Sequence, residues 1–190
     1  LPGVVMAPGF LSCIGRLCLV AAAALQPDAD VWRGKVESVV DGDTLRVRDG
    51  DARLQKVRIL GIDAPENGQP FFAAAREHLA KVTRDREVEV TPTGTDAQGR
   101  TVARVSMNGN DVSLDMLAAG LAWYQRGDTE NTALEAEERK ARARSAGLWI
   151  DKDPIAPWDW REAEKARSKG RKRPVPEAAP ASPPRPSDGG

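Results

Sequence analysis

The hydrophobic and polar positions predict strands near the beginning of the chain. A valine-rich stretch begins at about Trp32, and beyond it apolar Leu45 and Val47 alternate with polar neighbours, as in a strand that buries one face. The dipeptide Asp41-Gly42, which lies between these two stretches, is typical of a hairpin turn. A third apolar stretch covers residues 54–62, so the pattern predicts a three-stranded meander.

Further along the chain the apolar spacing becomes helical. Residues 71–82 carry apolar side chains every three or four positions, which predicts a helix with one buried stripe. Two more strands are predicted at residues 87–91 and 101–107. Two helices follow, one that ends at Gly120 and one that opens with the capping box Thr132-Ala133-Leu134-Glu135. These elements predict one α+β domain, mainly β, with five strands and three helices.

The pattern is lost after Trp149. Several prolines and tryptophans follow, which predict an irregular segment whose tryptophans pack on the core. Residues 161–173 are rich in Lys and Arg, and residues 174–190 consist mostly of Pro, Ala, Ser and Gly. Such compositions bury little apolar surface, so residues 162–190 are expected to form a basic, disordered tail. The tail is either simply solvated or holds an anionic polymer through phosphate attraction.

The first residues have the composition of a targeting segment. Residues 17–25 are apolar, Arg16 precedes them, and Ala22-Ala23-Ala24 offers a cleavage site for a signal peptide over residues 1–25. A disordered leader, or a start at Met6, is the alternative. Both cysteines lie in this segment, so residues 26–190 contain none, which is compatible with an oxidising environment. We therefore expect a secreted or periplasmic protein whose folded domain covers residues 26–161 and has no membrane span.

Charge and histidine content narrow the possible functions. The 28 basic and 28 acidic residues cancel, so any affinity for nucleic acid must come from local clusters. His78 is the only histidine, which excludes two-histidine ribonuclease chemistry unless a dimer supplies the second. We expect a structural or solvent-exposed role for His78. The Gly-x-Ser-x-Gly motif of serine hydrolases is absent from the sequence, which leaves metal-assisted attack by water.

Two aspartates are predicted to point toward the interior. Asp43 shares a strand face with Leu45 and Val47, and Asp63 continues the apolar side of its own strand. A buried carboxylate needs a cation or hydrogen-bond donors, and oxygen ligands of this kind suit calcium or magnesium. The sequence therefore favours a cation site at these aspartates, although each motif taken alone is also typical of an ordinary turn.

Two arginines could hold a phosphate next to these acids. Arg58 lies in the middle of a predicted strand and Arg100 follows a tight turn, and each taken alone is more often a surface residue. In a regular strand Arg58 and Asp63 would fall on opposite faces. Gly61 lies between them, and a glycine inside a strand often marks a bend that brings such residues to one side.

The acids and arginines lie in three motifs, which are Val39-Val40-Asp41-Gly42-Asp43-Thr44, Val57-Arg58-Ile59-Leu60-Gly61-Ile62-Asp63-Ala64-Pro65-Glu66 and Asp96-x-x-Gly99-Arg100. Taken together, these three motifs resemble those of the staphylococcal nuclease family. Two further matching segments are Ala119-Gly120-Leu121-Ala122-Trp123 and Gly147-Leu148-Trp149, so that the resemblance covers roughly residues 31–161. The resemblance implies a five-stranded OB-fold barrel with three helices.

The resemblance also implies a Ca²⁺-dependent enzyme that cleaves phosphodiester bonds of DNA and RNA and leaves the phosphate on the 3′ side. Asp43 and Asp63 match the calcium carboxylates of the family, and Ala64 would contribute its main-chain carbonyl. Glu66 matches the proposed base. The two arginines match those that bind the phosphate: Arg58 and Arg100.

Some positions depart from the family pattern. Ala97 and Gln98 stand where the founding member has Lys and Tyr, and Tyr124 is the only tyrosine, so substrate affinity and base preference stay open.

The implied partner is DNA or RNA, with no stable protein partner and a monomeric chain. The alternatives are a catalytically silent OB-fold module that binds nucleic acid or protein, and an envelope-associated scaffold that works through its tail. A silent module usually loses the acids that this chain keeps.

Overall fold

The computed structural model describes residues 31–127 and 131–171. The predicted signal peptide (residues 1–25) and residues 172–190 of the predicted tail lie outside the described residues.

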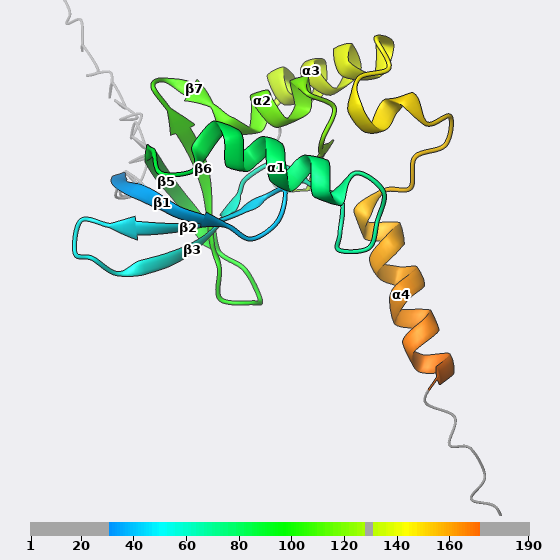
Figure 1. Cartoon of the computed structure of the whole chain (residues 1–190), viewed down its shortest axis with the longest axis horizontal. Coiled ribbons are helices and arrows are strands. Elements are labelled where there is room, and N and C mark those ends of the chain that lie inside the picture. The colour runs from blue at the N-terminus through cyan, green and yellow to red at the C-terminus, as the bar shows by residue number, and fades with distance from the viewer. Residues whose placement is uncertain (1–30, 128–130, 172–190) are drawn as a thin grey trace, which may run out of the picture.

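Five strands form a closed barrel (Figure 1). Their order is β3-β2-β1-β5-β6, and all neighbours in this order are antiparallel. A parallel pairing between β3 and β6 closes the barrel, so the sheet is mixed. The barrel strands are β1 (Trp32–Val39), β2 (Thr44–Asp49), β3 (Leu54–Ile59), β5 (Glu87–Thr95) and β6 (Thr101–Met107).

Short strands and helices complete the domain. Strand β4 (Ile62–Asp63) pairs with β8 (Trp123–Tyr124), and β7 (Asn110–Asp111) extends the edge at β6. In Figure 1 helix α1 crosses in front of the barrel, while α2 and α3 lie together beyond one end of it. The helices are α1 (Phe72–Thr83), α2 (Val112–Ala118), α3 (Thr132–Ala143), the 3-10 helix η1 (Gly147–Ile150) and α4 (Pro157–Arg171). The predicted five-stranded barrel with helices is confirmed.

Helix α4 is an element that the sequence pattern did not predict. Residues 157–171 are helical, so the predictions of an irregular segment and of a disordered tail are wrong there, while residues 151–156 are irregular as expected. Pro157 is well suited to the first helical position, because its fixed φ is helical and its missing N–H has no partner to lose. Pairs such as Arg167 with Glu164, three residues apart, support the helix further. Of the tryptophans expected to pack on the core, Trp158 is 40% exposed and is therefore only partly buried.

The residue that caps helix α3 lies one position before the predicted cap. Asn131 is the capping residue, and its Oδ1 accepts the main-chain N–H groups of Ala133 and Leu134 at 3.0 and 3.4 Å. The predicted capping box at Thr132 is therefore wrong by one position, and Thr132 is the first residue inside the helix.

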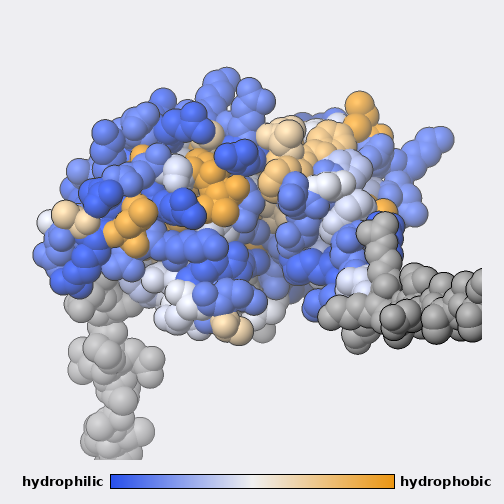
Figure 2. Space-filling view, turned by 60° about the horizontal axis from the view of Figure 1, so that its bottom comes forward, coloured by the Kyte–Doolittle hydropathy of each residue, from blue (hydrophilic) through white to orange (hydrophobic). Residues whose placement is uncertain are grey.

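The exterior of the domain is largely hydrophilic. The face drawn in Figure 2 is covered mainly by hydrophilic residues, with small apolar patches between them. Among the described residues, the large apolar side chains that are well exposed are Val31, Leu54, Ile150, Ile155 and Trp158. The part of the chain that the structure describes contains no helix with the length and apolar composition that a bilayer crossing requires.

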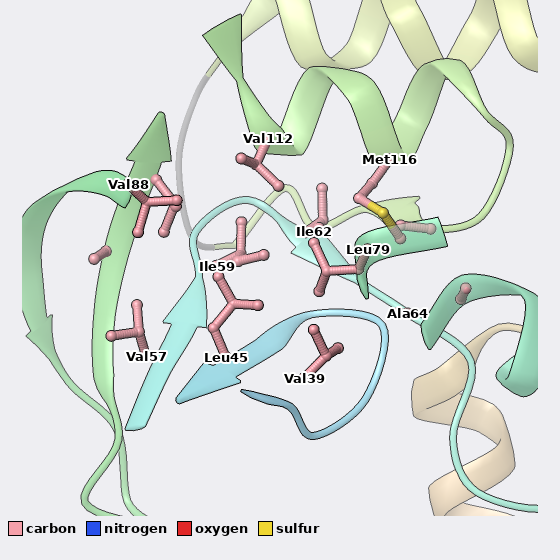
Figure 3. Packing of buried hydrophobic residues seen from close by; sticks show 14 of the residues in the cluster. Val39, Leu45, Val57, Ile59, Ile62, Ala64, Leu79, Val88, Val112 and Met116 are labelled. Carbon is pink, nitrogen blue, oxygen red and sulfur yellow. The ribbon is translucent and has the colours of Figure 1, made fainter. Parts of the chain in front are cut away.

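The core fills the barrel and continues under α1 and α2 (Figure 3). Leu45, Val57 and Ile59 come from the barrel strands and are fully buried. In Figure 3 Ile62 and Leu79 lie beneath Met116 of α2, so the two helices close one end of the barrel. This packing fixes the turn between β1 and β2 and the segment after β3, where the candidate site lies.

Candidate active site

The turn between β1 and β2 is pressed against the segment that follows β4. Asp43 donates its main-chain N–H to Oδ1 of Asp41 at 3.1 Å, which shapes the turn. A Cβ atom on Gly42 would lie 2.6 Å from Cβ of Ala64 and 2.8 Å from Cβ of Ala75. Only glycine allows this approach, and the approach places Asp43 next to Ala64.

The carboxylate of Asp43 is buried and held from both sides. The residue is 7% exposed. Its Oδ1 accepts the hydroxyl of Thr44 at 2.8 Å, and its Oδ2 accepts the main-chain N–H of Ala64 at 3.1 Å. The prediction that Asp43 points inward is therefore confirmed.

A bend at Gly61 brings Asp63 to the same side as Arg58. Gly61 adopts φ +79°, in the left-handed region that favours glycine, and it separates β3 from β4. As a result, Nη2 of Arg58 lies 3.7 Å from Oδ1 of Asp63 and 4.0 Å from Oδ2 of Asp43. The predicted bend is confirmed, and it solves the problem of the opposite strand faces.

Burial makes Asp41 and Asp63 costly to keep ionised. Burial raises the pKa of Asp63, and the nearby charge of Asp43 raises it further, while hydrogen bonds from Arg161 lower it. Burial, together with the charge of Asp43, raises the pKa of Asp41 to about 6. A site of this kind gains stability when a cation joins it.

A tight turn between β5 and β6 positions Arg100. Oδ1 of Asp96 accepts the main-chain N–H groups of Gln98 and Arg100, both at 2.9 Å, and Oδ2 accepts Nε–H of Arg100 at 2.6 Å. Nη1 of Arg100 donates to the hydroxyl of Thr44 at 3.1 Å. Because Thr44 also donates to Asp43, this chain of hydrogen bonds links the arginine to the buried carboxylate.

Glu66 lies in the loop between β4 and α1. Its main-chain N–H donates to Oε1 of Gln69 at 2.9 Å, and its Oε1 accepts Nη1–H of Arg161 at 2.6 Å. The Glu66 side chain is 38% exposed, so it is the most accessible of the predicted acids at the site.

One cavity of about 450 Å³ unites these groups. All the site residues predicted from the sequence line it, and so do several that the sequence analysis did not assign. The predicted ones are Asp43, Arg58, Asp63, Ala64, Glu66 and Arg100; the others include Asp41, Lys56, Asp96, Gln98, Gln125 and Arg161. The structure brings the predicted residues together, while their roles stay predictions.

Known proteins with similar sequences identify the family. Residues 56–151 match the family described as Staphylococcal nuclease homologue. The chain is 36% identical to the micrococcal nuclease of Shigella flexneri in an alignment of 169 positions that covers 81% of this chain and 97% of that protein. This chain belongs to the staphylococcal nuclease family.

Other relatives in the staphylococcal nuclease family are bacterial and plant proteins. An uncharacterized endonuclease of Haemophilus influenzae is 35% identical over 132 residues, which are 69% of this chain and 74% of that protein. A staphylococcal-like nuclease of Arabidopsis thaliana is 33% identical over 111 residues, 58% of this chain and 34% of that protein.

Arg161 is the main site residue that sequence reasoning missed. It comes from α4, far along the chain from the three family motifs, and the sequence analysis named it only as the first residue of a basic stretch at the end of the predicted domain. Asp41 was read only as part of a turn. Of the two positions that depart from the pattern of the staphylococcal nuclease family, Gln98 lines the cavity. His78 instead pairs with Asp115 at 2.6 Å between α1 and α2, in the structural role expected for it.

The donors in the cavity fit a hard cation. Carboxylate oxygens of Asp43 and Asp63 and the main-chain carbonyl of Ala64 are the oxygen ligands that calcium and magnesium prefer. Within residues 31–127 and 131–171, no group of three or more His, Cys, Asp or Glu side chains is placed to hold a metal ion. A cation bound here would therefore take further ligands from the main chain, water or substrate.

Proposed function

We propose that this chain is a calcium-dependent nuclease that hydrolyses phosphodiester bonds of DNA and RNA and leaves the phosphate on the 3′ side. Its family and the nuclease names of its relatives support a nuclease function. The observation that carries the proposal is that two acids for a cation, two arginines and a further acid line one cavity: Asp43, Asp63, Arg58, Arg100 and Glu66.

The two arginines bind the scissile phosphate. Arg58 is 9% exposed and lies on a barrel strand, while Arg100 is fixed by Asp96 and Thr44. A planar guanidinium group matches the oxygens of a phosphate bidentately. They stabilise the negative charge that grows on the non-bridging oxygens in the transition state. Removing one such donor typically raises the activation free energy by about 3 kcal/mol.

Glu66 acts on the attacking water. Its carboxylate lines the same cavity and is partly exposed, so a water molecule can reach it. Glu66 orients this water and accepts its proton as the new bond to phosphorus forms. The bond between phosphorus and the 5′ oxygen breaks in the same step, and the leaving 5′ oxygen takes a proton from solvent.

Asp43, Asp63 and the carbonyl of Ala64 hold the cation. When bound, calcium would neutralise charge on the phosphate and lower the pKa of the attacking water. Calcium is proposed because the resemblance implies it and because the donors are all oxygen atoms.

Digestion assays test the proposal directly. Purified protein is incubated with single- and double-stranded DNA and with RNA, in calcium, in magnesium, and in excess chelator. We expect cleavage with calcium and none with chelator. Product ends should resist 3′ extension by a polymerase until a phosphatase removes the terminal phosphate. Binding without hydrolysis in every metal would favour the silent OB-fold module instead.

Three variants assign the chemistry to the cavity. Arg58→Ala, Arg100→Ala and Glu66→Gln should each reduce kcat at least about a hundredfold while the fold is retained. Arg46→Ala is the matched control, because Arg46 is an exposed arginine of β2 that does not line the cavity. Full activity in the three site variants would assign hydrolysis to other residues.

We also propose that the protein works outside the cytoplasm as a monomer. The support is the sequence of residues 1–25, which resembles a signal peptide. Fractionation of expressing cells and N-terminal sequencing of the exported form test this proposal, and a protein retained in the cytoplasm with residues 1–25 intact would contradict it. Light scattering of the purified chain tests the monomer.

A further inference from the structure

Arg161 joins two carboxylates of the site. Its Nη2 donates to Oδ2 of Asp63 at 2.8 Å and its Nη1 donates to Oδ1 of the same carboxylate at 3.0 Å. Nη1 also donates to Oε1 of Glu66 at 2.6 Å. One guanidinium group thus grips Asp63 bidentately and reaches the carboxylate of Glu66 at the same time.

Glu66 needs support of this kind. It lies in a surface loop and its side chain is 38% exposed, whereas Asp63 is 1% exposed and comes from a strand. A partly exposed glutamate on a loop samples several rotamers unless another group holds it. A base that has to meet a water molecule in a fixed geometry loses rate when its position varies.

Helix α4 is attached to the same loop that carries Glu66. Gln69 is 5% exposed, and its amide bridges the loop: Oε1 accepts the N–H of Glu66 and Nε2 donates to the carbonyl of Ile155 at 2.6 Å. A Cβ atom on Gly68 would lie 3.9 Å from the ring of Trp160. Figure 1 shows the first turns of α4 beside this loop while the rest of the helix runs away from the barrel.

A small apolar cluster anchors the start of α4 to the domain. Ala156 is 8% exposed and packs in one cluster with Trp123 and Trp149. The rings of these two tryptophans meet edge to face, with centroids 5.2 Å apart. Arg161 lies little more than one helical turn beyond Ala156, so its main chain is held by this cluster.

We propose that Arg161 is a positioning residue of the site, held by α4 so that it fixes the carboxylate of Glu66 beside Asp63. The inference rests on the proposed function, in which Glu66 acts on the attacking water. Arg161 also balances charge where several acids line one cavity. Asp63 keeps further lone pairs for a cation, because an ionised carboxylate offers about four acceptor sites.

The geometry predicts that lysine replaces Arg161 only in part. Arginine presents several N–H donors in a rigid plane, and three of its hydrogen bonds are used here. A lysine ammonium keeps the charge but lacks the planar fork that spans both carboxylates. We therefore expect the kcat of Arg161→Lys to lie between those of the wild type and Arg161→Gln.

A double-mutant cycle of Arg161 and Glu66, measured by steady-state kinetics, tests the positioning role of Arg161. Arg161→Gln should lower kcat by about ten- to a hundredfold, with KM changed less than about threefold, as is typical when a group that orients a site residue is lost. In a Glu66→Gln background the same change should cost less than about twofold, because the carboxylate to be positioned is already gone. Arg167→Gln is the matched control, since Arg167 lies on α4 and pairs with the exposed Glu164.

Hydrogen exchange gives a readout that does not depend on activity. In the metal-free protein, amides of residues 64–71 should exchange faster in Arg161→Gln than in the wild type. The Arg167→Gln variant should exchange at the wild-type rate in this loop.

The outcomes separate this inference from the proposed function. Two results would show, for a wild type that cleaves nucleic acid, that Arg161 does not position Glu66. One is full kcat in Arg161→Gln. The other is that Arg161→Gln lowers kcat by the same factor in the Glu66→Gln background as in the wild type. A faster Arg161→Gln enzyme would make the arginine a brake on the site and overturn the inference. If the wild type cleaves no nucleic acid with any divalent metal, the proposed function fails. If the amides of residues 64–71 exchange in Arg161→Gln at the wild-type rate, the positioning role of Arg161 fails, whatever the activity.

Discussion

Gly42 lies where the turn between β1 and β2 comes closest to the rest of the site. An added methyl group would overlap Cβ of Ala64 and Cβ of Ala75, which are 2.6 and 2.8 Å from its position. The turn would then have to shift and carry Asp43 with it. We expect Gly42→Ala to lower the free energy of unfolding by about 1–3 kcal/mol and to reduce kcat at least tenfold.

Urea denaturation and the digestion assay check the Gly42 prediction. Gly50→Ala is the control, because nothing lies within 4 Å of a Cβ at Gly50 in the turn between β2 and β3. Equal stability and activity of the two variants would show that the close approach at Gly42 does not position Asp43.

Asp41 makes the stability of the metal-free protein depend on pH. Its pKa rises from 3.8 to about 6 on folding, chiefly through burial. The folded chain therefore keeps a proton that the unfolded chain releases, and its stability falls as the pH rises through about 4 to 6. Asp41→Asn removes this loss, so the variant should be more stable than the wild type by about 2 kcal/mol at pH 7.

Urea denaturation in chelator at two pH values measures the effect of Asp41. The gain from Asp41→Asn should be present at pH 7 and should nearly vanish at about pH 3, where the carboxyl is mostly protonated in both states. If Asp41→Asn raised the free energy of unfolding by the same amount at both pH values, the gain would come from hydrogen bonding and not from removal of a buried charge.

The sequence predicted a residue well where a local pattern revealed its environment. Asp43 was placed in the interior because it shares a strand face with apolar Leu45 and Val47, and the bend at Gly61 was inferred from a glycine within a strand. Arg161 offered no such clue. It meets Asp63, 98 residues away, only because α4 docks on the loop before α1, and no spacing in the sequence records that contact.

At the scale of the element, α4 shows why charged helices are hard to predict. Apart from its first turn, its described residues are mostly polar or charged, so no apolar stripe distinguishes it from a solvated tail. It is attached through its beginning, by Ala156, by the bond between Gln69 and Ile155, and by Arg161. The strands were easier, because alternation and turn dipeptides mark them directly.

Truncations test what α4 contributes. A chain that ends at Arg171 keeps the whole helix and should cleave nucleic acid within about twofold of the full chain. A chain that ends at Ala156 keeps the apolar cluster but lacks Arg161, and its kcat should fall at least tenfold. Circular dichroism confirms that each truncated barrel is folded before the rates are compared. Full activity of the shorter chain would show that α4 is not part of the working site.

At the scale of the whole molecule, the order of the strands was only partly accessible from sequence. The meander β1-β2-β3 follows from short turns between neighbouring strands. The parallel pairing that closes the barrel joins Val57–Ile59 with Thr101–Ala103, and alternation within each strand does not encode it. That closure was expected only through the family resemblance. It also places Arg58 next to Val102 and the turn that carries Arg100, so fold and site depend on one pairing.

The barrel assembles the proposed cation donors from parts of the chain that separate on unfolding. Asp43 follows β1 and Asp63 lies in β4, so only the folded chain brings both carboxylates into the cavity. A cation that binds the folded state alone raises the free energy of unfolding by about 3 kcal/mol at a hundred times its Kd. Calcium should therefore raise Tm by roughly 10 °C for a domain of this size, and chelator should reverse the rise.

Differential scanning calorimetry without nucleic acid measures the effect of calcium on Tm. Asp43→Asn should abolish most of the calcium-dependent rise, because a neutral amide is a weaker ligand for a hard cation than a carboxylate. Asp51→Asn is the control, since Asp51 lies in the turn between β2 and β3 with its side chain 70% exposed, and it should respond to calcium like the wild type. If calcium raised the Tm of both variants equally, the cation would bind outside the cavity. The acids that line the cavity would then have a role other than cation binding.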